Sequence, residues 1–410
     1  MKQSSKILND PLYGFISLKG GIILELIEHP YFQRLRRISQ LGLTNMVYPG
    51  ANHTRFQHAI GCMHLMQKAI DVLRLKGQEI TEKEAEAVNI AILLHDIGHG
   101  PFSHALENSI AHNITHEELS LLYMHKLNLE FKGKLDLAIQ IFSNTYYKKF
   151  LNQLISSQLD MDRMDYLNRD SFYSGVQEGI IGSERIINML NVANDNLMVE
   201  SKGIYSIEKF LIARRLMYWQ VYFHKTVVCA EQTLIKTLQR AKELTRAKDK
   251  LYCTPSLNLF LKDNFTLQDF KQNDNVFNAF NNLDDFDILS SIKEWQNHPD
   301  KILSSLSNNI IKRKLYKVML LDKPLHKSEI LEIKKRIVSS YSIAKKDVNY
   351  FFLSGKISNN TYKLNDSDIN ILDKNNSVKD LITAADQSTI SALTKTVKKY
   401  FYCYPKSLLI

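Results

Sequence analysis

The side chains best suited to catalysis gather in one short segment, LLHDIGHGPFSH, at residues 93–104. Within it, His95 and Asp96 stand side by side where an apolar run meets two glycines and a proline. Imidazole nitrogen and carboxylate oxygen together suit a divalent transition metal. Adjacent residues of a helix point about 100° apart, so both can reach one ion only if the ion lies beyond the helix end. The segment therefore predicts a metal site at the end of a helix.

Histidines are concentrated around this pair. Eight of the thirteen histidines lie between residues 53 and 116, whereas even spacing along the chain would place about two there. Any one of them taken singly is more simply explained as a capping or packing residue. The group as a whole indicates a functional centre.

Two further segments offer ligands of the same kind. HTRFQHAIG, at residues 53–61, places His58 on the first turn of a predicted helix. SQLDMDRMDYLNRDSFYSG, at residues 157–175, carries four aspartates among apolar residues, namely Asp160, Asp162, Asp165 and Asp170. Carboxylates within an apolar helix are costly to bury unless they are paired or bind a metal. Arg163 and Arg169 offer ordinary ion pairs as the alternative explanation.

The order of these motifs, H…HD…D in RFQH, LLHDIGHGPFSH and LDMDRMDYLNRD, resembles the HD-domain superfamily. The chain more closely resembles the deoxynucleotide triphosphohydrolases, which include bacterial dGTPase-like enzymes and the vertebrate SAM-and-HD-domain dNTPase. The segments NDPLYGFISL, HPYFQRLRRISQLG and VYPGANHTRFQH extend the likeness. It covers residues 6–240 strongly and the remainder loosely, and no SAM domain is expected ahead of it.

The resemblance implies four metal ligands, His58, His95, Asp96 and Asp162. The choice of Asp162 among the crowded aspartates follows the family motif, because spacing alone does not separate it from its neighbours. The implied cofactor is a divalent ion (Mn, Fe, Mg, Zn or Ni), with Mn or Mg favoured for activity. Two histidines and two carboxylates leave coordination positions for water and phosphate.

In the family, a metal-activated hydroxide attacks the α-phosphorus of a dNTP, and the deoxynucleoside and intact inorganic triphosphate leave. By resemblance, His104 is the general acid at the 5′ oxygen, since the pKa of a histidine lies close to working pH. His99 and His116 are its near neighbours in this role, and Glu117 orients His104 or His99.

The resemblance also implies eight substrate contacts, at Gln40, Leu41, Arg55, Arg163, Tyr166, Asp170, Arg214 and Tyr222. The arginines hold the triphosphate, Tyr166 stacks under the deoxyribose and blocks a 2′-hydroxyl, and Asp170 binds the 3′-hydroxyl. Gln40 and Leu41 close the sugar pocket. Rejection of a ribose in this way is mainly steric. Each arginine taken singly could instead form an ordinary ion pair.

Members of this family are often tetrameric and nucleotide-activated. The implied activator site comprises Lys6, Glu28, Gln33, Arg36, His224 and Lys225. Glu28 replaces an aspartate of the vertebrate enzyme, and its longer side chain shifts the carboxylate that reads guanine there. The resemblance thus implies a dNTP substrate, a nucleotide activator and a homo-oligomer, with a tetramer favoured. Such an enzyme controls dNTP pools, in housekeeping or in phage defence.

Helices are expected to position these residues. Apolar residues recur at helical spacing over residues 22–39, with a break at the proline, and over residues 58–75. Thr81 and Glu84 form a capping-box pattern at the start of a helix that runs into the His-Asp pair. The pattern at residues 207–245 is long enough for one helix or two.

The chain is predicted to be mainly α. An HD-type helical core is expected at residues 1–250, a helical extension at residues 251–345 and a small α/β lobe at residues 346–410. The β-like runs VNYFFLSG, TYKL and INIL favour the lobe. The Asn-rich stretch KQNDNVFNAFNNLDDFD is expected at the surface with short helices and is the nearest candidate for disorder.

The composition of the chain indicates which classes of ligand and which cellular location are expected. The net charge of +10 and the pI of 9.1 favour anions, so nucleic acid is an open partner although no known nucleic-acid-binding motif is present. No apolar run reaches the roughly 18 residues that cross a membrane, and no signal peptide is recognisable. Four scattered cysteines suit a reducing cytoplasm. Two alternatives stay open: an HD phosphohydrolase acting on a monophosphate, cyclic dinucleotide or alarmone, and a nucleic-acid-binding regulator.

Overall fold

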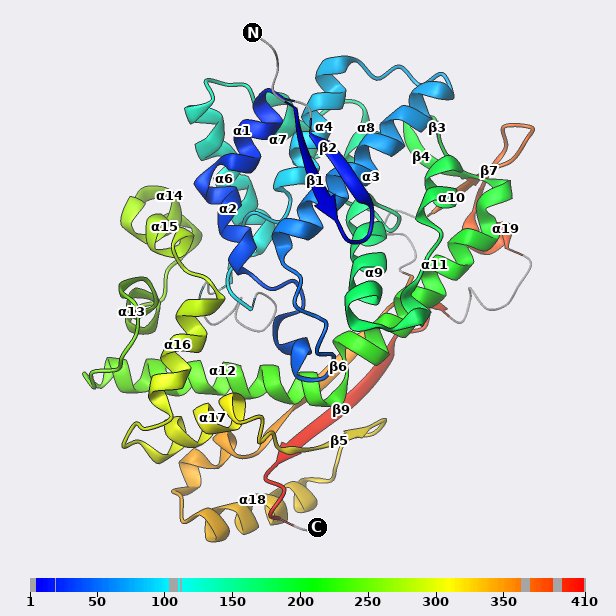
Figure 1. Ribbon diagram of the computed structural model, residues 1–410. Coiled ribbons are helices and arrows are strands. Elements are labelled where there is room, and N and C mark those ends of the chain that lie inside the picture. Colours follow the sequence, from blue (N-terminus) through cyan, green and yellow to red (C-terminus); the bar gives the residue numbers. More distant parts are fainter. Residues whose placement is uncertain are drawn as a thin grey trace.

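The structure, a computed structural model, is mainly helical, with three small sheets attached to a helical body (Figure 1). It describes residues 5–18, 20–102, 110, 113–362, 369–385 and 393–408. The predicted fold class, mainly α with a small mixed C-terminal lobe, is confirmed. One hydrophobic core runs from Ile16 to Leu408. Among the described residues, no helix combines the length and the apolar character that crossing a bilayer requires.

The helices of the described chain are α1 (Ile22–Glu28), α2 (Pro30–Gln33), α3 (Arg55–Leu75), α4 (Glu82–Leu94), α6 (His116–Glu130), α7 (Asp136–Phe142), α8 (Lys149–Gln153), α9 (Met161–Ser174), α10 (Ser183–Asn188), α11 (Ile204–Met217), α12 (Lys225–Arg246), α13 (Pro255–Lys262), α14 (Leu267–Gln272), α15 (Asp274–Asn281), α16 (Asp285–Trp295), α17 (Lys301–Ile311), α18 (Lys327–Tyr341) and α19 (Leu381–Ala384). The strands are β1 (Lys6–Asp10), β2 (Gly14–Leu18), β3 (Leu190–Ala193), β4 (Asn196–Glu200), β5 (Lys317–Leu321), β6 (Leu353–Asn359), β7 (Asn370–Leu372), β8 (Val378–Asp380) and β9 (Val397–Tyr404).

Three helices carry the predicted metal ligands, and their sequences explain where each begins. α3 follows Thr54, which forms a capping box with Gln57. α4 follows Thr81 and its capping-box partner Glu84, as predicted. α9 follows Asp160, whose carboxylate accepts a hydrogen bond from a backbone N–H of the first turn. Side-chain caps satisfy N–H groups that a helix start leaves unpaired, so these starts are set locally.

Two glycines let the helices around the site approach closely. A Cβ at Gly61 of α3 would overlap the Asp165 carboxylate of α9. A Cβ at Gly98, just after α4, would overlap the backbone of α6 at His116. Because any side chain would separate these segments, glycine is required at both positions.

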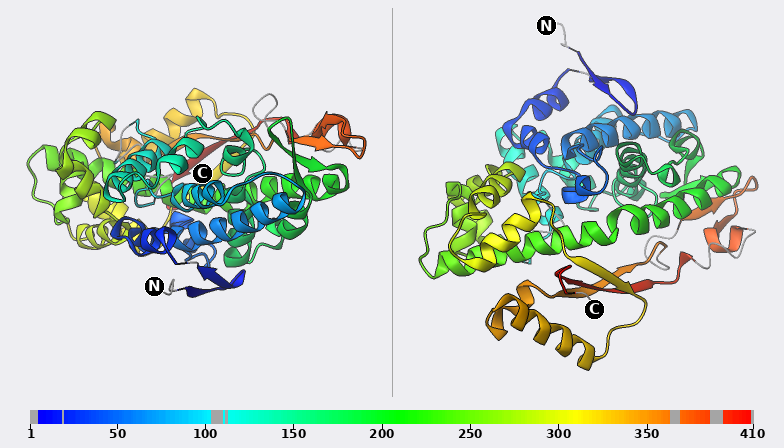
Figure 2. Two further views of the ribbon diagram at one scale, coloured as in Figure 1. Left: turned by 90° about the horizontal axis from the view of Figure 1, so that it is seen from above. Right: turned by 60° about the horizontal axis from the view of Figure 1, so that its bottom comes forward.

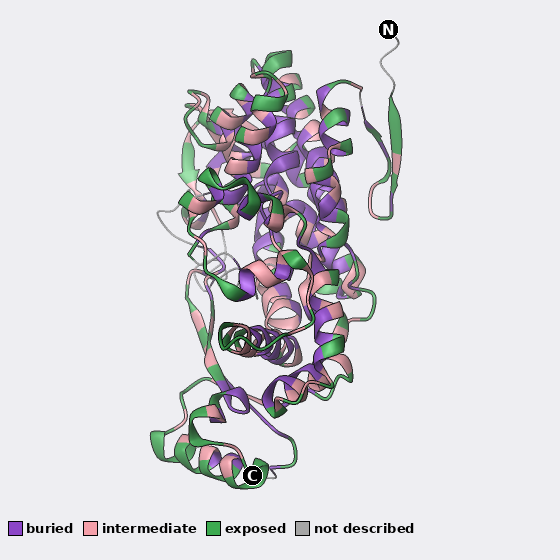
Figure 3. Cartoon of the chain, turned by 90° about the vertical axis from the view of Figure 1, so that its left-hand side faces the viewer, coloured by how far each residue is buried: buried purple, intermediate pink, exposed green. Residues whose placement is uncertain are grey.

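The sheets lie around the edges of the helical body. β1 and β2 form an N-terminal hairpin, β3 and β4 pair with β7 and β8, and the third sheet has the order β5-β9-β6. This third sheet and α18 lie beyond α12, away from the helices of the body (Figures 1 and 2). Most of α18 is exposed, whereas the interior of the body is buried (Figure 3).

Two expectations drawn from local patterns are confirmed only in part. The Asn-rich stretch contributes to the short helices α14, α15 and α16, as predicted, and is not disordered, because Phe277 and Phe280 are buried and Asn273 and Asp284 cap helix starts. Its polar residues serve the helix ends rather than a loose surface. The run VNYFFLSG is strand only in its second half, because residues 345–350 form a 3-10 turn.

Other patterns had mixed outcomes. The long pattern at residues 207–245 is two helices, separated by a π-helical turn at Tyr218–Tyr222. INIL corresponds to β7, whereas Thr361 and Tyr362 of TYKL are not strand and its last two residues lie outside the described ones. The domain boundaries near residues 250 and 345 stay predictions.

Candidate metal and nucleotide site

Four side chains converge at the centre of the helical body. His58 lies on the first turn of α3, His95 caps the end of α4, Asp96 follows it, and Asp162 lies on the first turn of α9. The Nε2 atom of His58 is 3.1 Å from an oxygen of Asp162 and 3.7 Å from one of Asp96. The Nε2 atom of His95 is 3.4 Å from Asp96 and 3.7 Å from Asp162. These are the four predicted ligands, and the structure brings them together.

Both histidines are turned so that Nε2 faces this cluster. The Nδ1 atom of His58 donates to Asp165 at 2.7 Å, and that of His95 donates to the Ile92 carbonyl at 2.6 Å. Such contacts orient metal-binding imidazoles and leave the other nitrogen for the ion. The Nε2 atom of His95 is buried and has no hydrogen-bond partner among the described residues. The donor set and this buried nitrogen fit a divalent metal ion, and no particular metal is singled out.

The structure separates the aspartates that spacing left equivalent. Asp160 caps α9, and burial followed by the nearby Asp162 raises the pKa of its carboxyl to about 6. Asp165 pairs with Arg169 at 2.9 Å, and Arg169 also contacts Asp10 of the N-terminal hairpin at 2.8 Å. Only Asp162 of this group faces the two histidines.

Cys62 is a further donor close to the cluster. Its Sγ lies 3.5 Å from the ring nitrogens of His58, one turn earlier on α3. Burial raises the pKa of this thiol well above its ordinary value. Because the thiolate is the form that binds metals, Asp96 is the better fourth ligand.

Asp96 lies between the predicted ligands and the cations beside them. Arg55 donates to its Oδ2 at 2.5 Å, and the Nε2 atom of His99 lies 3.3 Å from its Oδ1. Burial acts to raise the pKa of Asp96, but His95 and Arg55 hold it well below its ordinary value. Asp96 is therefore an anion at neutral pH, as a metal ligand must be.

Two of the three predicted catalytic histidines, His99 and His116, lie among the described residues. His99 is buried and its ring stacks on His116 with centroids 3.9 Å apart. Burial, followed by Arg55, lowers the pKa of His99 well below its ordinary value, so its ring is neutral near pH 7. Glu117 lies 3.2 Å from His116, and its orientation of His104 or His99 stays a prediction. His104, the predicted general acid, lies outside the described residues.

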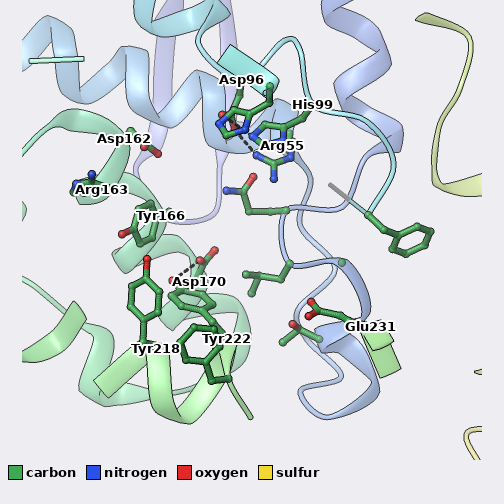
Figure 4. Close-up of a pocket in the computed structure, with 17 residues that line it drawn as sticks. Arg55, Asp96, His99, Asp162, Arg163, Tyr166, Asp170, Tyr218, Tyr222 and Glu231 are labelled. Atoms are coloured by element: carbon green, nitrogen blue, oxygen red, sulfur yellow. Dashed lines mark hydrogen bonds and ion pairs between the residues drawn. The ribbon is translucent and has the colours of Figure 1, made fainter. Parts of the chain in front are cut away.

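A cavity of 410 Å³ opens beside this cluster (Figure 4). It is lined by Gln40, Leu41, Gly42, Thr44, Arg55, Asp96, His99, Phe102, His116, Asp162, Arg163, Tyr166, Asp170, Tyr218, Tyr222, Phe223 and Glu231. Arg55, Asp96 and His99 lie together at one end, and Glu231 lies away from them. The cavity is within the usual size range for a small-molecule site.

Comparison with known proteins identifies the family. The family described as HD domain matches residues 55–170, and the one described as HD associated region matches residues 181–253. The uncharacterized protein YwfO of Bacillus subtilis is 31% identical over 98% of this chain and 93% of its own length. The chain belongs to the HD-domain phosphohydrolase family.

Two further relatives carry informative names. The crystal structure of a phosphohydrolase from Bacteroides thetaiotaomicron is 51% identical, with a TM-score of 0.95 over 98% of this chain and 100% of that one. The deoxynucleoside triphosphate triphosphohydrolase SAMHD1 homolog of Dictyostelium discoideum is 31% identical over 61% of this chain and 52% of its own length. The likeness to the named dNTPase therefore concerns about half of that protein.

In this HD-domain protein, the part of the cavity beyond the metal cluster is rich in tyrosine. Asp170 accepts hydrogen bonds from His53 and from the Tyr222 hydroxyl, both at 2.7 Å. Tyr166 lies against Tyr222 with ring centroids 6.2 Å apart. The predicted sugar-binding residues are thus neighbours, and the Asp170 carboxylate is held in a fixed orientation.

The predicted phosphate-binding arginines have different surroundings. Arg55 and Arg163 line the cavity, and Arg163 is held by the Ser157 carbonyl at 2.8 Å. Arg214 does not line it, and its guanidinium donates to the Thr361 carbonyl at 3.2 Å. It lies close enough to Tyr166 to lower the pKa of that phenol, against the larger effect of burial.

The predicted activator residues fall into two groups. Lys6 pairs with Glu28, and Gln33 bonds the Ile27 carbonyl at 2.7 Å and accepts from Arg36 at 2.8 Å. These four residues lie where the N-terminal hairpin meets α1 and α2. The other two are His224, which caps α12, and Lys225, its first residue. No described contact joins the two groups within one chain.

Several residues that line the cavity belong to no recognisable sequence motif. Tyr218 lies in the π-helical turn and Glu231 lies on α12, outside any motif. No described residue forms a hydrogen bond or an ion pair with Glu231, and burial raises its pKa to about 7. A carboxylate without a protein partner in a cavity wall is a candidate ligand contact.

Proposed function

We propose that this chain hydrolyses deoxynucleoside triphosphates to a deoxynucleoside and inorganic triphosphate. One observation carries the proposal: a single cavity joins the metal-binding cluster to a tyrosine-lined compartment that holds Asp170. Metal ligands suit phosphate chemistry, and the compartment suits a sugar. The names of the SAMHD1 relatives support the same substrate class.

The charged residues divide the work on the triphosphate. A divalent ion held by the cluster lowers the pKa of water and neutralises phosphate charge. Arg55 and Arg163 both line the cavity and supply cations for the phosphate oxygens. Arg55 donates a hydrogen bond to Asp96, so its guanidinium is oriented toward the reacting centre.

The sugar is selected by shape. Tyr166 forms a rigid wall, and Asp170, held by His53 and Tyr222, offers an acceptor for a 3′-hydroxyl. A 2′-hydroxyl adds volume against the tyrosine, which disfavours ribonucleotides.

The base is read at the far end, where Glu231 lines the cavity. An ionised carboxylate accepts from donors on the pairing edge of a base. Guanine presents N1–H and the N2 amino group there, whereas thymine presents one N–H between two carbonyls. Glu231 therefore favours dGTP over dTTP.

Nucleotide activation and a homo-oligomer, favoured as a tetramer, belong to the same proposal. Lys6, Glu28, Gln33 and Arg36 gather two cations, a carboxylate and an amide at one surface site, which suits a second nucleotide. His224 and Lys225 lie apart from them, so a site made of all six requires a second copy of the chain.

The test is product analysis with purified protein. Each dNTP is supplied alone and in pairs, with Mn²⁺ or Mg²⁺, and products are separated by anion-exchange chromatography. We expect deoxynucleoside and inorganic triphosphate in equal amounts, and little turnover of ribonucleotides. Release of orthophosphate or pyrophosphate would point to the other HD chemistries instead. Turnover only in paired mixtures would establish activation.

A further inference from the structure

The net charge of the chain is confined to its last quarter. Residues 312–410 contain 19 lysines and arginines against 9 aspartates and glutamates, which accounts for the whole net charge of +10. Residues 1–311 contain 34 of each sign and are neutral overall. We call residues 312–410 the C-terminal lobe, a longer segment than the α/β lobe predicted at residues 346–410, and residues 1–311 the body. Any role of the basic charge must therefore be sought in the C-terminal lobe.

The two segments also differ in what their cations contact. Many cations of the body form ion pairs, including Arg37–Asp284, Lys68–Glu184, Arg74–Glu82, Lys76–Glu200, Lys126–Asp274, Lys148–Glu84 and Arg240–Asp300. In the C-terminal lobe, the exposed lysines that form no ion pair with any described residue include Lys317, Lys335, Lys345, Lys346, Lys356 and Lys398. Their charges are available to an external anion.

Three of these lysines share one face of the sheet β5-β9-β6. Residues directly opposite in an antiparallel pair lie on the same face. Lys356 is opposite Tyr400, and Lys398 is opposite Ser358. Lys317 is opposite Tyr404 on the same face. The opposite face, which carries Cys403 and its neighbours, packs against α12.

Of the described residues, those that cover the outer face lie at one end of it. The segment leading into α18 lies over it at Tyr402, whose hydroxyl accepts from the Leu325 backbone at 3.0 Å. Lys356, Ser358 and Lys398 remain exposed, beside the half-buried ring of Tyr400. An open strip of lysines around an aromatic ring results.

We propose that this outer face binds single-stranded nucleic acid. Surfaces of that kind combine cations that follow the phosphates with aromatic rings on which bases stack. The lysines of the strip supply the first and Tyr400 the second. A second copy of the chain would place lysines against lysines, which like-charge repulsion disfavours. The proposal is independent of the dNTPase activity, because none of these residues lines the active-site cavity.

The contribution of the lysines is measured by the fluorescence anisotropy of a fluorescein-labelled 20-nucleotide single strand of DNA or RNA. Replacing Lys356 and Lys398 with alanine removes two phosphate contacts. We expect the slope of log K against log salt to become shallower by about 1.4, and affinity at 0.1 M salt to fall about 20-fold. The control replaces Lys83 and Lys271, two exposed lysines of the body, and leaves both values unchanged. Equal losses in both variants would overturn the proposal.

The aromatic contact is tested at Tyr400. Tyr400→Phe keeps a ring and should bind as the parent does, whereas Tyr400→Leu should bind about tenfold more weakly. Equal affinity of the two variants contradicts stacking. Displacement of the strand by 1 mM dATP would place it in the active-site cavity and overturn the proposal. The proposal would also be overturned if the Lys356→Ala/Lys398→Ala variant had a changed oligomeric mass but an unchanged affinity for the oligonucleotide. The face would then be an interface between copies of the chain.

Discussion

The body and the C-terminal lobe treat charge in opposite ways. In the body, Arg169 lies fully buried between Asp10 and Asp165, and Asp165 in turn orients His58. In the lobe, lysines such as Lys335 are exposed and have no acidic partner among the residues that the structure describes. The same kind of side chain therefore serves as internal scaffolding in one region and as an open surface in the other.

The difference follows from the cost of burying charge. A charge inside a protein must be paired and hydrogen-bonded, so its geometry is fixed. Such charges are suited to holding ligands of a metal in place. A solvated charge is loosely positioned but reaches partners at a distance, within the limits of salt screening. The body is thus built for chemistry on a small substrate, and the lobe for contact with an extended anion.

The largest expected effect comes from Asp162→Ala in the metal cluster. Loss of one ligand and its charge should reduce turnover at least about 1000-fold, since the metal contributes several kcal/mol to the transition state. Triphosphate release under saturating Mn²⁺ measures this. Oligonucleotide affinity should be unchanged, which separates the two regions. Activity that survives the substitution would remove Asp162 from the ligand set.

The second effect compares a buried cation with an exposed one. Arg169→Ala leaves the carboxylates of Asp10 and Asp165 buried without their partner and should cost about 3–5 kcal/mol of unfolding free energy. Lys335→Ala in the lobe should change it by less than about 0.5 kcal/mol. Urea unfolding followed by circular dichroism measures both. Similar values for the two variants would contradict the difference in charge burial between the body and the lobe.

The third effect concerns the far end of the cavity and depends on pH. Because burial raises the pKa of Glu231 to about 7, its carboxyl is neutral at pH 6 and ionised at pH 8. The ratio of kcat/KM for dGTP to that for dTTP should rise over this range. Glu231→Gln should lower the ratio about tenfold at pH 8 and flatten its pH dependence. Glu243→Gln, on the same helix but outside the cavity, is the control, and an equal change there would exclude base reading by Glu231.

The sequence alone predicted those site residues that lie in short local motifs, but not those whose role depends on how the helices pack. The motifs around His58, His95 and Asp96 are local and ordered, so their grouping followed from resemblance to a family. Asp160 and Asp165 could not be separated from Asp162 by spacing, since the choice depends on which side of α9 faces α3. The sequence signals the presence of a carboxylate, but packing decides its use.

Residues and strands without a local pattern were missed. Glu231 lies on α12, far along the chain from the motifs, and reaches the cavity only because α12 crosses beneath the body. β5 pairs with β9, which lies far along the sequence, so no strand close to β5 in the sequence indicated that this short segment belongs to a sheet. The buried phenylalanines of the Asn-rich stretch were outweighed by its polar composition. Pairing and packing across the chain supply what local patterns lack.

The smallest expected effect is that of the lobe lysines on kcat/KM for dNTPs, which tests whether their charge attracts the substrate to the active site. If the lysines steered dNTPs toward the cavity, Lys356→Ala/Lys398→Ala would lower kcat/KM, and more so at low salt. We expect less than a twofold change at 0.15 M salt, because charges beyond about 8 Å are largely screened there. A steep loss at 0.02 M salt would show that the lobe acts on the substrate. Unchanged kcat/KM together with weakened oligonucleotide binding would instead assign the two charge patterns to two different ligands.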